Sequence, residues 1–97
     1  MGDRPGAAAG PVEPLPALNP KIAARVVNGE ALILTPHDSV LHTLNPVATR
    51  IWELMRDHGT VQAVVDAVVA EFDVDAATAE ADLRELLKDL QAKQILE

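Results

Sequence analysis

The passage at residues 40–52 constrains the fold most, because its apolar residues change their period there. Residues 40–44 alternate as in a β-strand, whereas the apolar residues from Ala48 onward recur at helical spacing. The change falls on Asn45-Pro46, a pair typical of an N-cap followed by the first residue of a helix. The sequence therefore predicts strands before Asn45 and helices after it.

Three strands are predicted before this point, at residues 22–27, 31–35 and 40–44. Asn28-Gly29 favours a two-residue hairpin loop between the first two, since both positions tolerate positive φ. With that loop, Arg25 lies opposite Leu32. A turn at residues 36–39 returns the chain, so we expect a three-stranded antiparallel meander with the second strand central and the third at an edge.

Three helices are predicted after the switch. They span about 46–58, 61–72 and 76–93, with Asn45, Thr60 and Asp75 as their caps. Gly59 is expected to end the first helix in the left-handed conformation, and residues 95–96 to fold back as a closing segment. Three strands followed by three helices predict a small α+β domain whose helices pack on one sheet face.

Residues 1–20 differ in composition from the rest of the chain. They hold five of the seven prolines and three of the five glycines, with three alanines in a row between them. Such a segment buries too little apolar surface to offset its chain entropy. We therefore predict a flexible Pro/Gly/Ala-rich arm at residues 1–20 and one domain at residues 21–97.

The charge and composition exclude several classes of partner. The formal net charge of −7 argues against a nucleic acid, because that affinity comes largely from Lys and Arg neutralising phosphates. The absence of cysteine excludes disulfides and thiolate metal sites and fits the cytoplasm. No apolar stretch is long enough to span a bilayer, and the N-terminus does not resemble a signal peptide. We expect a cytoplasmic protein with no membrane partner.

The search for catalytic chemistry finds little. His37, His42 and His58 fall in a turn, a strand and a helix end, without a ligand-spaced partner, so no metal site is expected. No serine and histidine stand in a nucleophile context, and no glycine-rich loop opens a helix after a strand. The sequence predicts neither an enzyme nor a cofactor site.

A binding role fits the third helix and the third strand better. On a helical wheel Ala79, Leu83, Leu86 and Leu90 share an arc expected to face the core, and Leu87 lies at its margin as a candidate lip residue. If this helix lies beside the third strand, an extended peptide could add to that strand's edge. The alternative is an edge strand protected only by charge or by dimerisation, so a homodimer stays open.

The segment 44–54, Leu-Asn-Pro-Val-Ala-Thr-Arg-Ile-Trp-Glu-Leu, resembles the pyrroloquinoline quinone synthesis protein D (PqqD-like) family. Other matches follow in the family's order, and the resemblance covers about residues 20–97. They are Arg25, Leu32 to Pro36, Gly59 to Val61, Val64-Val65, Phe72 to Asp75, Ala81 to Leu83, Leu86-Leu87 and Ile95-Leu96.

The resemblance implies a winged-helix-like domain without catalytic activity, a recognition element for ribosomally made, post-translationally modified peptides. Members bind the leader of a precursor peptide by strand addition and present it to a modifying enzyme, often a radical S-adenosylmethionine (radical SAM) enzyme. The peptide-facing positions carried over are Val40, Leu41, His42, Thr43 and Leu44 on the strand, and Arg84, Leu87, Lys88 and Gln91 on the last helix. The two basic residues would suit an acidic leader.

Two alternatives remain beside the predicted peptide chaperone. A winged-helix DNA-binding regulator shares the architecture, but its recognition helix should be basic, whereas residues 61–72 contain Asp66 and Glu71 and no Lys or Arg. Within the peptide interpretation, the pathway is either pyrroloquinoline quinone synthesis or that of another modified peptide.

Overall fold

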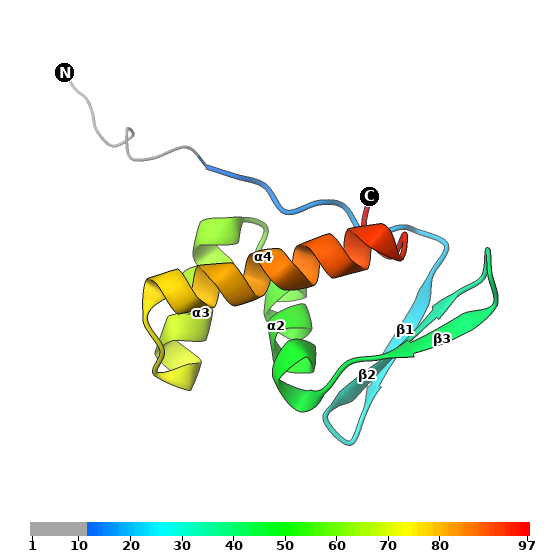
Figure 1. Ribbon diagram of the computed structural model, residues 1–97, viewed down its shortest axis with the longest axis horizontal. Helices are drawn as coiled ribbons and strands as arrows, with labels where there is room; N and C mark the ends of the chain where they lie inside the picture. Colours follow the sequence, from blue (N-terminus) through cyan, green and yellow to red (C-terminus); the bar gives the residue numbers. More distant parts are fainter. Residues whose placement is uncertain (1–11) are drawn as a thin grey trace.

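The computed structural model describes residues 12–97 (Figure 1). Three strands, β1 (Ala23–Val27), β2 (Glu30–Thr35) and β3 (Val40–Thr43), precede three helices, α2 (Pro46–Asp57), α3 (Val61–Phe72) and α4 (Ala76–Ala92). This confirms the predicted α+β class, a three-stranded antiparallel sheet followed by three helices. Residues 1–11 of the predicted arm lie outside the described residues.

The sheet has the predicted order and register. Its strands lie in the order β1-β2-β3, so β2 is central and β3 is an edge strand. Asn28 and Gly29 have φ values of 54° and 77°, as the hairpin requires. Arg25 lies opposite Leu32, which confirms the register expected from a two-residue loop.

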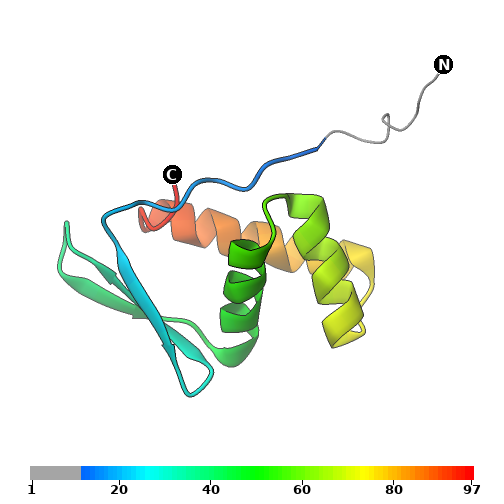
Figure 2. The ribbon, with the colours of Figure 1, turned by 180° about the vertical axis from the view of Figure 1, so that it is seen from behind.

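The sheet extends away from the helices rather than lying beneath them (Figures 1 and 2). Of the three helices, α2 makes the main contact with the sheet, through β2, while α4 packs against α3. The prediction that the helices pack together on one sheet face is therefore wrong for α3 and α4. The sheet face that carries Leu34 and Leu41, on the side away from the helices, faces solvent.

One hydrophobic core joins the sheet to the helices. Trp52, the single tryptophan, is only 2% exposed, and Ile33 of the central strand is fully buried. Ile95 and Leu96 are also buried, which confirms the predicted closing segment. The remaining core residues are Ala31, Leu44, Ile51, Leu54, Met55, Val61, Val64, Val65, Val68, Ala79, Leu83, Leu87 and Leu90.

The three N-terminal helix caps are the predicted residues, but α2 does not end in the predicted conformation. Asn45, Thr60 and Asp75 accept hydrogen bonds from the backbone N–H groups of Ala48, Ala63 and Thr78. Gly59 does not adopt the left-handed conformation; instead α2 ends at Asp57 and His58 is extended, with φ −123°. Two residues after His58, Thr60 forms an isolated antiparallel β-bridge with Pro14.

The described part of the N-terminal segment, residues 12–20, runs along the helices and the C-terminus (Figure 2). Val61 N–H donates to the Glu13 carbonyl at 2.9 Å, and Leu15 N–H donates to the Gly59 carbonyl at 3.1 Å. Farther on, Leu18 forms a bridge with Leu96. The segment thus connects the α2–α3 turn to the end of the chain, while the flexibility predicted for residues 1–20 stays a prediction.

The Thr49 hydroxyl links three elements in the interior. It accepts the Ala31 N–H at 2.8 Å and donates to the Leu44 carbonyl at 3.2 Å, while Leu44 N–H donates to the Ala31 carbonyl at 3.0 Å. Thr49 is 2% exposed. The hydroxyl therefore completes the β2–β3 ladder at its last pair and fixes α2 to it.

Replacing Thr49 with valine should lower the free energy of unfolding by about 1–3 kcal/mol, because the buried Ala31 N–H then has no acceptor. Thr49→Ser keeps the hydroxyl and should retain more of the stability than Thr49→Val. Urea denaturation of the three proteins measures the difference. Equal losses in both variants would show that the methyl group matters and the hydroxyl does not.

Gln94 occupies a position where glycine is favoured. Its φ is 61°, Ile95 N–H donates to the Leu90 carbonyl at 2.9 Å, and Gln94 N–H donates to the Gln91 carbonyl at 3.0 Å. This is a Schellman motif, in which the residue after the cap is left-handed. A side chain there is strained, because its Cβ crowds the following carbonyl.

Gln94→Gly should therefore raise the free energy of unfolding by about 0.5–1 kcal/mol, the relief of strain being partly offset by the entropy of glycine in the unfolded chain. Thermal unfolding followed by circular dichroism measures the change. Gln94→Ala, which keeps the Cβ, should give no gain, and a gain of equal size would contradict the strain argument.

Candidate functional site

In the described part of the chain, β3 is paired on one side only. Hydrogen-bonded and non-hydrogen-bonded pairs alternate along an antiparallel ladder. Because Leu44 N–H donates to the Ala31 carbonyl, the alternation directs the N–H and C=O groups of Leu41 and Thr43 away from β2. The outer edge of β3 thus offers two donors and two acceptors.

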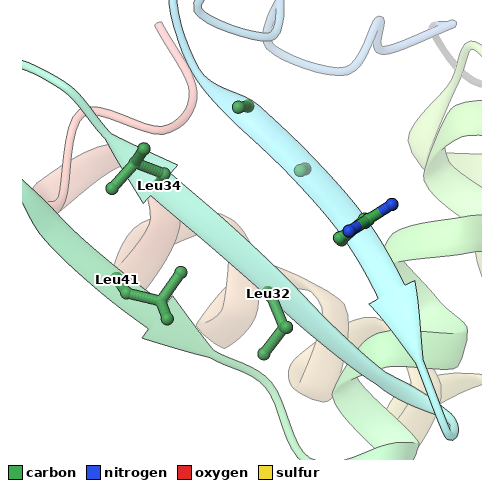
Figure 3. Close-up of a pocket in the computed structure, with 6 residues that line it drawn as sticks. Leu32, Leu34 and Leu41 are labelled. Atoms are coloured by element: carbon green, nitrogen blue, oxygen red, sulfur yellow. The ribbon is translucent and has the colours of Figure 1, made fainter.

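The two faces of β3 differ in their surroundings. Val40 and His42 share the face of Thr35 and Ile33, whereas Leu41 shares the opposite face with Leu34. Figure 3 shows Leu41, Leu34 and Leu32 together on that outer face, with the helices behind the sheet. Leu41 is 59% exposed and Leu34 is 41% exposed. A shallow hollow of about 250 Å³ there is lined by Ala23, Ala24, Arg25 and the three leucines.

A small polar network holds the turn that precedes β3. The Thr35 hydroxyl lies within hydrogen-bond distance of Asp38 Oδ1 and is 3.1 Å from His42 Nε2, and Asp38 Oδ1 also accepts the Val40 N–H at 3.2 Å. The Thr35 hydroxyl, helped by the Val40 N–H, lowers the pKa of Asp38 below its ordinary value of 3.8. Ionised Asp38 therefore supports the start of the edge strand.

Asp38→Asn should lower the free energy of unfolding at neutral pH. In acid the two proteins should be equally stable. Because the folded pKa is below 3.8, the carboxylate contributes stability above that pH and loses it as pH falls through the folded pKa. Denaturant unfolding of both proteins across an acidic pH series measures the gap. The gap should close below pH 3.8, and a gap that does not change with pH would contradict a role for the charge.

A groove of about 510 Å³ lies between the start of α2 and one side of α4. Its lining includes Asn45, which follows β3 by two residues. Its α2 side is lined by Asn45, Val47, Ala48 and Ile51, and its α4 side by Asp82, Glu85, Leu86 and Asp89.

The structure reverses the roles expected of two neighbouring leucines on α4. Leu87, predicted as a lip residue, is 6% exposed and belongs to the core. Leu86, predicted to face the core, is half-buried and lines the groove. The cause is the packing of α4 on α3, which turns the helix away from the orientation assumed from its wheel alone.

The other predicted positions on α4 also lie away from the groove. Arg84 pairs with Glu13 of the N-terminal segment, at 2.7 Å, and with Glu80, at 2.9 Å. Hydrogen bonding to Arg84 lowers the pKa of Glu13, and the two carboxylates raise the pKa of Arg84. Gln91 donates to the Glu97 carbonyl, and Lys88 is exposed but does not line the groove.

Sequence reasoning missed the residues that α4 does present to the groove. Asp82, Leu86 and Asp89 follow i, i+4, i+7 spacing, and Glu85 is three residues after Asp82. This spacing places them on one side of the helix, beyond the margin of the predicted apolar arc that is opposite Leu87, so the groove and the predicted lip lie on different sides of that arc. Of the predicted strand positions, Leu41 and Thr43 are exposed, His42 is half-buried, and Leu44 belongs to the core.

Within residues 12–97, no group of three or more His, Asp or Glu side chains could hold a metal ion. None of the helices in this described range is long and apolar enough to cross a membrane.

The fold and this site define a class: a small α+β domain in which the outer edge of β3 is unpaired within the described residues and a helical groove begins just after that strand. The chain belongs to the family of coenzyme PQQ synthesis protein D (PqqD), whose family model matches residues 30–96. This confirms the resemblance seen in the sequence.

A solved structure is similar to this chain over most of its length. It is described as TbiB1 in complex with the TbiA(beta) leader peptide, and it matches with a TM-score of 0.78 and 31% sequence identity. The match covers 84% of this chain and 94% of that chain. Comparison with curated proteins gives no match.

Proposed function

We propose that this domain binds the leader of a ribosomally made precursor peptide as a fourth strand on β3 and presents it to a modifying enzyme. The free outer edge of β3, in a fold shared with a leader-bound protein, is the observation that carries the proposal. Strand addition gains affinity from backbone hydrogen bonds, and the neighbouring side chains add selectivity.

In this proposal the domain acts by binding, without chemistry of its own. Its contribution is to hold the peptide beside an enzyme, which raises the effective concentration of the peptide there. The family suggests a radical SAM enzyme as the partner, and the cysteine-free sequence fits the cytoplasm as the location. Pyrroloquinoline quinone synthesis and another modified-peptide pathway are both compatible with this role.

The surface charge supports a peptide partner over DNA. In a winged-helix DNA reader the recognition helix carries Lys and Arg toward phosphates. The α3 helix instead exposes Asp66 and Glu71, and Glu71 pairs with Arg50 of α2 at 2.6 Å. A phosphate backbone would meet carboxylates there.

Thr43→Pro tests strand addition directly. Proline removes the outward-facing N–H of this exposed edge residue, whereas an edge position tolerates proline with little loss of pairing to β2. Leader binding should weaken roughly tenfold, the value of one to two backbone hydrogen bonds. Calorimetric titration with peptides encoded beside this chain, and with the TbiA(beta) leader as a second probe, measures the affinity.

Thr43→Val is the matched control, because it changes the side chain and keeps the N–H. It should bind the peptides nearly as well as the unchanged protein. Thermal unfolding of both variants shows whether β3 remains paired. Unchanged affinity in a folded Thr43→Pro protein would rule out pairing at this edge position.

A further inference from the structure

The groove beside β3 combines an apolar floor with a negative rim. Ile51 is 4% exposed and Leu86 is half-buried, so both contribute apolar surface, while Val47 at the start of α2 is 53% exposed. The rim on α4 is formed entirely by carboxylates. They belong to Asp82, Glu85 and Asp89.

Among residues 12–97, ion pairs compensate only part of this negative charge. Lys93 pairs with Asp89 at 2.9 Å, but no basic side chain among residues 12–97 forms an ion pair with Asp82 or Glu85. The nearest arginine of α4, Arg84, is held by Glu13 and does not line the groove.

The start of α2 offsets only part of the remaining charge. Asn45, Val47 and Ala48 place the N-terminus of this helix at the groove, and a helix N-terminus is equivalent to roughly half a positive charge. Two carboxylates without ion pairs exceed that amount. Stabilisation of α2 therefore does not account for the whole rim, and a positively charged occupant is favoured.

We infer that the groove selects leaders carrying a Lys or Arg within an apolar stretch. The leader backbone pairs with β3, an apolar side chain rests on Leu86, and the basic group lies beside Asp82 and Glu85. The aliphatic stem of Lys or Arg can cover the apolar floor while its charge stays at the rim. This inference rests on the proposed function and reverses the expectation of an acidic leader.

A library of random dodecapeptides displayed on phage tests the inference and does not require the natural leader. Panning on the full chain should enrich peptides that hold Lys or Arg next to apolar residues, relative to the unselected library. Panning on the double variant Asp82→Asn/Glu85→Gln should lose the basic preference and keep the apolar one. A synthetic peptide from the first selection should bind the double variant roughly tenfold more weakly at low salt.

Asp57→Asn/Asp66→Asn is the matched control, because it removes the same charge from exposed positions that do not line the groove. It should retain the affinity for the selected peptide. Enriched peptides without a basic preference, or equal binding by both double variants, would overturn the inference and leave strand addition standing. Selected peptides that bind a folded Thr43→Pro protein as well as Thr43→Val would instead contradict the proposed function.

Discussion

The arrangement of sheet and helices depends on the buried Thr49 hydroxyl. It lies between Ala31 of β2 and Leu44, which directly follows β3, and it belongs to the first turns of α2. Burial makes an unmet N–H or C=O group costly, so this contact determines where the chain can leave the sheet. Asn45 then caps α2 immediately after the ladder ends. The groove starts at this junction, with Asn45 and Ala48 in its lining.

The same contact sets the phase of the ladder and thereby the chemistry of the free edge. The backbone of Leu44 faces β2, so the backbone groups of Leu41 and Thr43 must face outward, in the plane of the sheet. An open edge also invites pairing between copies. Here β3 has only four residues and the chain has a net charge of −7, features that limit such pairing. A short edge gives few backbone bonds, which makes the side chains around it important for selectivity.

Signals between near neighbours made most of the fold predictable. Asn28-Gly29 determined the hairpin register, and Asn45-Pro46 marked the start of α2, because each acts through hydrogen bonds or dihedral angles a few residues away. The rotation of α4 was not predictable in this way. Leu86 and Leu87 are adjacent, and either could belong to the apolar arc of α4. Packing against α3 determines which of the two is buried. The prediction that Gly59 is left-handed was wrong for a similar reason: the carbonyl of Gly59 accepts the Leu15 N–H of the N-terminal segment, which is distant in sequence.

The two sides of α4 differ in charge because of the spacing of its residues. Arg84 pairs with Glu13 and Glu80 and does not line the groove. Asp82 and Glu85 are two residues and one residue from Arg84, spacings at which side chains on a helix do not face each other. The acidic rim and the paired arginine therefore lie on different sides of α4. Affinity at this site would come from the backbone edge of β3, and the preference for charge from α4, so the two can change independently through mutation.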